Sequence, residues 1–592
     1  MKARLRAKVR SVRHALGSAA VPASQKPAPP APRRPPGLVG SARRGGWEVD
    51  VATAALLRDL GGVLHERRPP KVAVLVDGPG RDWRAVLTGT YPRAVVDVVD
   101  VSGLDASGLH ARLAAAGRLD AIVDDAAREA QDVGTLKDVL FHLRSGGALL
   151  VRLPLSRGDG SRSADVDPWT LVTDALSAPP APEGGSREER DRRALAAGVS
   201  GLRFGPGHLT VLNRDSRLAK LREDEMDTVL ELRGSEAGVV HARLPEQEFT
   251  SLCVLRENTE VRDARMPAAY SVPAMSLREY HDVVCLPRQI VVQRAVLAPD
   301  SFRYNAAPRL VHRYLEDAGP RFADVPAGLK KARPLTGTYF HLDSEWTGHF
   351  GHAMTEQMSR LWALEEAQRL APGLRGLVSR RRSQEHELME FEIGIFEAAG
   401  LSRSDIVLYD APVQVEHLMA ASPMFSMPTH VHPGLAEVWK GIGDRLVESA
   451  PEYAYARRIF CSRRLSRRAC HNLDEVEAFF ESYGFVVTYP EELTFAEQAR
   501  TFREAEVIAG FAGSALFTSC FSVTPRHLVI LSPTSYPARN EYMICAVLGH
   551  QLDFVWSRPD AEEVRGPDPR YAGFRFDFEA EGVFLREVLE SL

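Results

Sequence analysis

The sequence predicts an α/β protein made of several folded units, and three observations support this. The chain has 592 residues, which at roughly 100–200 residues per domain corresponds to about three domains. Its hydrophobic content of 44% and charged content of 26% are those of a soluble globular protein. Short apolar runs alternate with helix-like segments in 47–214 and again in 446–560. This order favours mostly parallel sheets covered by helices.

Composition and charge exclude several classes of protein. The net charge of −4 argues against a general binder of polyanions, so we expect no nucleic-acid partner. The six cysteines form no C-x-x-C pair, so we expect neither a disulfide framework nor a structural zinc site. No apolar run reaches the ~18–20 residues of a membrane span, and the N-terminus lacks an apolar leader. We therefore expect a cytoplasmic protein in a reducing compartment.

Residues 1–46 form a basic tail rich in Pro and Ala. Positions 1–45 contain eleven Lys and Arg residues and no Asp or Glu. Val21–Pro36 predicts an extended linker, and Met1–Gly17 can form a short amphipathic helix with a narrow apolar face. Two interpretations stay open: an unpacked tail, or peripheral contact with the anionic inner face of the plasma membrane, to which each basic residue contributes on the order of 1 kcal/mol.

The first folded unit is expected at 47–214. Four apolar runs predict its strands, two segments between them predict helices, and Ala178–Arg193 predicts an exposed loop. The strands are expected at Lys71–Val76, Ala94–Asp100, Leu119–Asp125 and Ala148–Val151. The helices are expected at Ser107–Ala116 and Thr135–Leu143.

This unit resembles the class I methyltransferases, which have a Rossmann-like fold. The resemblance rests on the turn at 77–83 after the first strand, on Asp100 at the end of the second, and on the "LDAIVDD" run. In that family the turn holds adenosylmethionine and the second-strand acid binds its ribose. Here Pro79, Arg81 and Trp83 would hinder close approach of a ligand, so we expect a scaffold domain that does not use adenosylmethionine as a cofactor. Retained nucleotide or methyl-donor binding is the alternative, and Asp124 and Asp125 are either functional or helix caps.

The most informative segment of the second unit is 346–362. A helix from about Gly351 places His352, Glu356 and Arg360 at i, i+4 and i+8, on one stripe. A neutral His beside a carboxylate is a suitable general base, because the carboxylate fixes its tautomer and raises its basicity. The alternative is a His–Glu–Arg ladder on a solvated face.

A basic run follows the strand predicted at Ile459–Cys461. Arg463 and Arg464 stand at the end of the strand, with Arg467 and Arg468 soon after. Guanidinium groups bind phosphate oxygens in pairs, which suits a diphosphate; a solvated basic loop is the alternative.

The strand and helix signals then repeat up to 532. Asn472 and Thr494 are candidate N-caps, and Thr494 with Glu497 predicts a capping box. A strand at Glu506–Ala509 runs into the small-residue turn Gly510–Leu516, where a helix N-terminus could receive a phosphate. The order of elements predicts a second Rossmann-like sheet.

These motifs together resemble the family 61 glycosyltransferases, over about Asp215–Pro559. The resemblance implies a GT-B fold with two Rossmann-like halves, inversion at the sugar, a nucleoside-diphosphate sugar as donor, and no required metal or other cofactor. It places His352 and Glu356 at the catalytic positions. It assigns the binding of the donor diphosphate to Arg463, Arg464, Gly510, Gly513, Ser514 and Ala515. It assigns supporting roles to Arg360, Glu491, Glu492 and Gln498. Leu516 also fits the family's turn.

One departure from the family lies in the turn, where Phe511-Ala512 replaces Pro-His. If that His assists catalysis, its loss weakens donor binding or activity, although the backbone N–H groups remain. We expect 215–592 to be the glycosyltransferase region, with halves at 335–445 and 446–560 and a C-terminal segment at 561–592.

We therefore expect an inverting glycosyltransferase acting on a glycan or cell-surface polysaccharide; the high Ala and Arg content suggests a bacterial source. The alternatives are an impaired scaffold of an envelope-glycan assembly complex and a bifunctional glycosyltransferase/methyltransferase.

Overall fold

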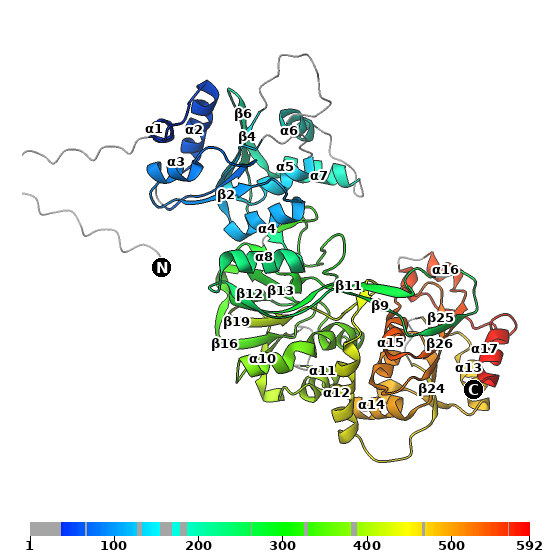
Figure 1. Cartoon of the computed structure of the whole chain (residues 1–592). Helices are drawn as coiled ribbons and strands as arrows, with labels where there is room; N and C mark the ends of the chain where they lie inside the picture. The colour runs from blue at the N-terminus through cyan, green and yellow to red at the C-terminus, as the bar shows by residue number, and fades with distance from the viewer. Residues whose placement is uncertain are drawn as a thin grey trace, which may run out of the picture.

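The computed structural model describes residues 37–64, 68–126, 133–153, 168–177, 186–261, 263–324, 329–380, 388–464, 468–565 and 568–592. The expected amphipathic segment 1–17 and linker 21–36 lie outside the described residues. The protein is mixed α/β with several sheets. Figure 1 shows the unit that begins the chain, in blue and cyan, above a green sheet layer, with the orange and red C-terminal sheet beside that layer.

The first sheet has six strands in the order β2-β1-β3-β4-β6-β5. The strands β2, β1, β3 and β4 are parallel to one another, as the sequence predicted, while β6 is antiparallel to both β4 and β5. The strands are β1 (Lys71–Val76), β2 (Val95–Asp100), β3 (Leu119–Asp124), β4 (Leu143–Arg152), β5 (Val199–Gly205) and β6 (His208–Asn213).

Helices lie on both faces of this sheet. On one face pack α1 (Leu38–Arg44), α2 (Val51–Val63) and α3 (Trp83–Thr90). On the other lie α4 (Ala106–Ala116), α5 (Val133–Leu140) and α7 (Arg187–Gly198), and α6 (Pro168–Ser177) packs on α7. The expected loop at Ala178–Arg193 is wrong from residue 187 onward, because Ser186 and Glu189 form a capping box that starts α7.

The second sheet has ten strands in the order β15-β7-β14-β13-β12-β19-β16-β17-β18, with β8 paired to β12. It is mixed: β19, β16, β17 and β18 are parallel, whereas β12 is antiparallel to β8, β13 and β19. The strands are β7 (Arg217–Lys220), β8 (Gly238–Leu244), β12 (Met275–Leu286), β13 (Ile290–Gln293), β14 (Val296–Leu297), β15 (Phe322–Asp324), β16 (Arg333–His341), β17 (Arg375–Ser379), β18 (Ile406–Tyr409) and β19 (Val413–Ala421).

The boundary expected at residue 335 falls inside β16, so one sheet joins residues on both sides of it. This sheet also receives the first unit on one face: α4 packs on α8 (Glu223–Arg233), and a single apolar core continues from β1 and β3 to β12 and β19. Its other face carries the helices α10 (Leu364–Leu370), α11 (Glu390–Ala398) and α12 (Leu435–Ser449).

The third sheet is wholly parallel, in the order β10-β26-β25-β24-β22-β23. Its edge strand β10 comes from far earlier in the chain than the rest. The strands are β10 (Val254–Glu257), β22 (Arg458–Cys461), β23 (Val486–Thr488), β24 (Val507–Phe511), β25 (His527–Pro533) and β26 (Gln551–Ser557). The small sheet of β9 (Gln247–Thr250) and β11 (Ala269–Val272) flanks β10 in sequence.

Helices cover the third sheet on both faces. One face shares its core with α12 and with the second sheet, through α14 (Phe495–Glu504), the 3₁₀ helix η7 (Ser514–Phe521) and α15 (Asn540–Leu548). The other packs on α13 (Leu473–Ser482) and α17 (Gly582–Glu590). The predicted capping box at Thr494 and Glu497 is confirmed. Among the described residues, every helix is too short or too polar to cross a membrane.

Candidate functional site

A helical segment from Phe350 to Leu370 carries the first group of predicted site residues. It is not a regular helix, because α9 (Phe350–His352) continues as a π-helical stretch, η3 (Ala353–Gln357), and then as a 3₁₀ stretch, η4 (Met358–Ala363), before α10. The prediction of a regular helix from Gly351 is therefore wrong in its hydrogen-bond pattern. Local changes of winding of this kind are frequent at functional sites.

His352 and Glu356 lie together, as the spacing predicted. His352 Nδ1 is 2.7 Å from Glu356 Oε1, and because a carboxylate only accepts, Nδ1 is the donor in this hydrogen bond. Arg303 forms an ion pair with the same carboxylate, and Ser344 Oγ donates to its other oxygen at 3.4 Å. Burial raises the pKa of Glu356, but the charges of Arg303 and His352 outweigh it and leave this pKa below its usual value. Glu356 is therefore an anion that orients the imidazole.

Arg360 does not join this pair. Its guanidinium is buried, 3.8 Å from Asp300 Oδ1 and 3.5 Å from His341 Nδ1. The π-helical and 3₁₀ turns between residues 353 and 363 change the number of residues per turn, so position i+8 no longer falls on the stripe of His352. The expected three-residue stripe is thus a two-residue pair.

Aromatic rings hold His352 from the side. Its ring stacks on Trp346, with centroids 5.3 Å apart and planes 6° apart, and lies 4.7 Å from the ring of His349. Arg313 covers the ring of Trp346 at 3.8 Å. The imidazole is therefore fixed in orientation by stacking as well as by Glu356.

The second group of predicted residues lies at the C-terminal end of β22. Arg463 Nη2 donates to the carbonyl oxygen of Arg468 at 2.8 Å, and Arg468 reaches the carbonyl oxygen of Ala512 at 3.5 Å. Burial and the neighbouring Arg468 lower the pKa of Arg463 to about 10. The guanidinium groups of Arg463 and Arg468, whose positive charges repel each other, therefore lie at the C-terminal end of a parallel sheet. Such a pair suits a multivalent anion.

Arg464 turns away from Arg463. It is exposed, pairs with Glu492 at 2.7 Å, and donates its backbone N–H to Glu491 at 3.0 Å. Its guanidinium covers the ring of Tyr489 at 3.8 Å. Gln498 donates to the carbonyl oxygen of Leu493. The side chains of Glu491, Glu492 and Gln498 thus make local contacts, and Arg468 rather than Arg464 accompanies Arg463.

The small-residue turn joins β24 to η7 next to these arginines. Gly510 is required by packing, since a Cβ there would lie 2.6 Å from the carbonyl oxygen of Cys461. Gly513 has a φ of 153° and donates its N–H to Glu541 at 2.7 Å. Ser514 and Ala515 then open η7, where the first backbone N–H groups of a helix lack intrahelical partners.

Glu541 lies under this turn and is completely buried. Burial raises its pKa to about 7, against the lowering effect of its backbone hydrogen bonds and of Arg539 and Arg468. Because this pKa lies within the ordinary pH range, the carboxyl group beneath the turn can be either neutral or negatively charged.

The two groups of residues meet at Gly351 and Ser514. An ideal Cβ on Gly351 would stand 3.0 Å from Ser514 Cβ and 3.3 Å from Phe517 Cε2, so only glycine permits this approach without a shift of its neighbours. His352 follows Gly351 directly. The residue before His352 therefore packs against the first residue of η7.

Two other candidate regions lie apart from this site. A pocket of about 290 Å³ is lined by residues from 68–120 and 233–295, and none of the predicted site residues lines it. In the first unit, Trp83 is fully buried and donates to Asp125 at 2.9 Å, while Asp100 accepts hydrogen bonds from Gly78 and Ser102. Asp125 also pairs with Arg152, and Asp124 is buried.

Sequence reasoning missed Arg303, Trp346 as a ring partner, and Glu541. Along the chain, Arg303 lies 53 residues before Glu356 and Glu541 lies 185 residues after it, so no local spacing could connect them. Arg468 was visible only as part of a basic run.

Comparison with known proteins connects this geometry to a family. Residues 350–531 match the model of the family Glycosyltransferase 61, which confirms the predicted resemblance for this part of the chain and suggests a glycosyltransferase. No curated protein matches the sequence.

Solved structures with some similarity are methyltransferases. The MycE methyltransferase from the mycinamycin biosynthetic pathway, in complex with Mg and SAH, is 15% identical with a TM-score of 0.25, and the match covers 31% of this chain and 54% of that one. The chain thus spans about half the length of that protein. The release factor-specific protein-(glutamine-N5) methyltransferase from Alicyclobacillus acidocaldarius is 15% identical, with a TM-score of 0.18 and coverage of 28% and 94%.

Proposed function

We propose that this protein is an inverting glycosyltransferase that moves a sugar from a nucleoside-diphosphate sugar to a hydroxyl group of a glycan or cell-surface polysaccharide. The observation that carries the proposal is the close approach of Gly351 to Ser514, because it brings a base–carboxylate pair and a phosphate-suited turn into one site. The match of residues 350–531 to a glycosyltransferase family supports the same reaction class.

The proposed base is His352. The acceptor hydroxyl attacks the anomeric carbon, its proton passes to His352 Nε2, and the bond from that carbon to the diphosphate oxygen breaks. Attack opposite the leaving group inverts the configuration. Glu356 holds Nδ1 and stabilises the imidazolium that forms, in the way that a carboxylate supports a catalytic histidine.

The proposed diphosphate site consists of Arg463, Arg468 and the N–H groups of Ser514 and Ala515. Two guanidinium groups and the N-terminal end of η7 stabilise the negative charge that develops on the leaving nucleoside diphosphate. In this proposal these cationic groups take the place of a metal at the donor, and Arg464, Glu491, Glu492 and Gln498 shape the segment beside them.

A turnover assay tests the proposal. The purified full-length chain is incubated with a panel of nucleoside-diphosphate sugars and glycan acceptors, and release of the nucleoside diphosphate is followed. We expect release with one donor, a product anomer opposite to the donor in its NMR couplings, and loss of release in His352→Asn. Absence of release with every donor, or turnover unchanged in His352→Asn, contradicts the proposal.

The first unit is proposed to act as a scaffold. Trp83, the last residue of the turn at 77–83, is buried in the core and donates to Asp125, and Asp100, the residue expected to meet a ribose, accepts hydrogen bonds from Gly78 and Ser102. A bifunctional methyltransferase is the competing proposal, and saturable binding of adenosylmethionine would favour it.

A second candidate function is a scaffold of an envelope-glycan assembly complex without catalysis. Ala512 favours it, because the side chain at this position is a buried methyl group where the family has an imidazole. Retained turnover argues against it. We further propose a cytoplasmic location, with residues 1–17 as the segment that could touch an anionic membrane.

A further inference from the structure

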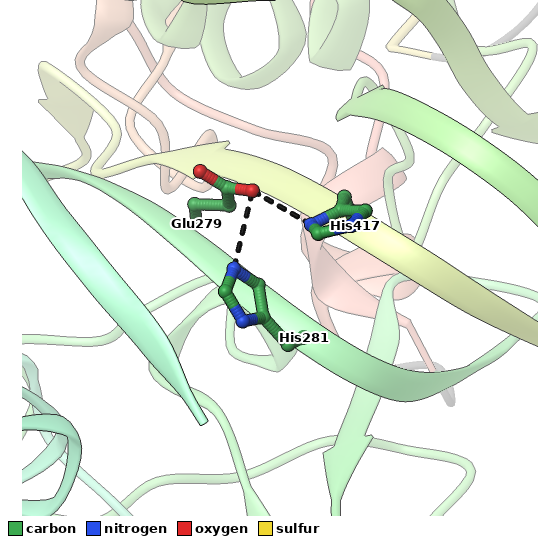
Figure 2. A group of neighbouring side chains, drawn as sticks. All are labelled: Glu279, His281 and His417. Atoms are coloured by element: carbon green, nitrogen blue, oxygen red, sulfur yellow. Dashed lines mark hydrogen bonds and ion pairs between the residues drawn. The ribbon is translucent and has the colours of Figure 1, made fainter. Parts of the chain in front are cut away.

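Three histidines surround one glutamate on the second sheet, outside the site described above. Glu279 and His281 lie on β12, His417 lies on β19 and His241 on β8, which are neighbouring strands. His281 and His417 are directly opposite each other in the antiparallel register. Figure 2 shows Glu279 between the rings of His281 and His417, with its carboxylate directed at both.

The ligating atoms of this cluster converge. Glu279 Oε1 is 2.8 Å from His417 Nδ1 and 3.2 Å from His281 Nε2, and one such atom from each of the three residues lies within 4.8 Å of the others. The other carboxylate oxygen, Oε2, is 2.7 Å from His241 Nε2. Oε1 therefore faces two imidazole nitrogens, while Oε2 is held by His241.

The chemistry of the converging groups is that of a metal site. The rings of His281 and His417 are only 4.7 Å apart, and both face Oε1 of Glu279. Imidazole nitrogens and a carboxylate oxygen are the ligands that zinc and similar cations take.

Access and support also fit a metal ion. The side chains of His281 and His417 are 24% and 35% exposed and that of Glu279 is 15% exposed, so an ion can enter and keep a water ligand. A ligating carboxylate is usually held by a further hydrogen bond, and His241 supplies one.

We propose that Glu279, His281 and His417 bind a late first-row divalent cation, zinc being the one that this ligand set suits best. The ion takes Oε1, Nε2 and Nδ1 as ligands, water fills the remaining position, and any proton shared between these atoms leaves to solvent. His241 positions Glu279 without touching the ion. The ion would tie β12 to β19 and so brace the sheet on which the helices of the transfer site pack.

This site is independent of the proposed sugar transfer, because its residues are not those of the donor or base site. It does not conflict with a donor site that uses arginines. The cysteine spacing, which predicts no cysteine-bound zinc, does not bear on histidines that come from separate strands.

Zinc binding to the full-length chain tests the proposal. The protein is stripped with a chelator and titrated with Zn²⁺ by calorimetry, and with Co²⁺ by visible absorption, which reports the coordination geometry of the bound ion. We expect one ion per chain, release of protons in buffers of different ionisation enthalpy, and a melting temperature raised by several degrees at saturating Zn²⁺. Mg²⁺ should have no such effect.

Variants separate the ligands from their support. His281→Ala/His417→Ala should abolish stoichiometric binding, and His241→Gln should weaken it by about 10- to 100-fold, the range for residues that hold a ligand. His527→Ala is the matched control, since His527 also pairs with a carboxylate on a strand, that of Asp553, and should bind as the wild type does. If the double variant fails to fold, Glu279→Gln, which can keep its contacts with the histidines, must still lower the affinity.

Two results overturn the proposal. One is wild-type protein that binds no more Zn²⁺ than the double variant or Glu279→Gln. The other is equal loss of binding in His527→Ala, which would place the ion elsewhere. Because neither measurement involves sugar transfer, failure of this proposal leaves the proposed function untouched.

Discussion

Gly351 lies against Ser514 so closely that a Cβ on the glycine would stand 3.0 Å from the Cβ of the serine. The two residues come from the first turn of α9 and the first turn of η7, which lie in the segments that carry the base pair and the phosphate-suited turn. Their contact sets the separation of the two halves of the proposed site. A small change at this point should therefore affect both stability and catalysis.

Gly351→Ala should destabilise the protein by about 1–3 kcal/mol, the usual cost of forcing extra volume into a packed contact. It should also lower turnover, because His352 moves with its neighbour. Urea unfolding and the release assay measure the two effects. Gly441→Ala is the control: Gly441 is exposed within α12 with nothing within 4 Å of its Cβ position, so alanine should stabilise the helix by about 0.5–1 kcal/mol. Equal behaviour of the two variants would refute the role of the contact.

His352→Asn should lower kcat by about 10²–10⁴-fold, the typical contribution of a general base, and leave the donor KM nearly unchanged. Glu356→Gln should act in the same direction with a smaller effect, because it keeps the shape of the pair and removes the charge. Steady-state kinetics of diphosphate release gives both numbers. His471→Asn, at a partly exposed residue paired with Asp560, serves as the comparison and should be silent. A wild-type kcat in His352→Asn would assign the base elsewhere.

Arg468→Ala should raise the donor KM and lower kcat, with kcat/KM reduced by about 10- to 100-fold, since it removes a charge-assisted contact to the diphosphate. Arg464→Ala should change kcat/KM by less than about twofold, because this exposed side chain already pairs with Glu492. The pair of variants compares two arginines four residues apart in the sequence. The reverse ranking would show that the inward arginine is not the donor ligand.

The part of diphosphate binding that depends on Glu541 should be stronger at pH 6 than at pH 8. The pKa of Glu541 is about 7, so its carboxyl group under Gly513 is neutral below that pH and anionic above it, where it opposes a bound anion. Folding favours the protonated form of this group, so its contribution to stability is fully present below about pH 4.5 and is lost as the pH rises through about 7. Calorimetric affinities at the two pH values measure the effect.

Glu541→Gln is the control for that pH dependence. It keeps the acceptor for the N–H of Gly513 and removes the titrating proton, so the part of the pH dependence due to Glu541 should vanish while that of the nucleotide's own phosphates remains. An identical pH dependence in wild type and variant would rule Glu541 out as its source.

Local sequence signals predicted much of the fold. The apolar runs of 71–76 and 528–532 lie in strands β1 and β25, and the capping box at Thr494 and Glu497 begins α14, because these features depend on neighbouring residues alone. The mixed second sheet was not predicted, since β12 and β19 pair across more than a hundred residues and their patterns do not specify partners.

The candidate site was predicted in its residue types and less well in its geometry. The i, i+4 spacing of His352 and Glu356 survives in a π-helical stretch, but the direction of Arg360 does not, because hydrophobic periodicity cannot reveal a local change of winding. Which arginine of the basic run turns inward depends on Glu491 and Glu492, which hold Arg464 from a later segment. A local sequence pattern cannot show which arginine is held by acidic residues from a later segment.

The most direct test is calorimetric titration of the wild-type chain with a panel of nucleoside diphosphates, and with adenosylmethionine. We predict saturable one-to-one binding of one nucleoside diphosphate, weakened in Arg468→Ala and retained in His352→Asn, and no binding of adenosylmethionine. Absence of binding by every diphosphate, or a diphosphate affinity that Arg468→Ala leaves unchanged, would contradict the proposed glycosyltransferase site.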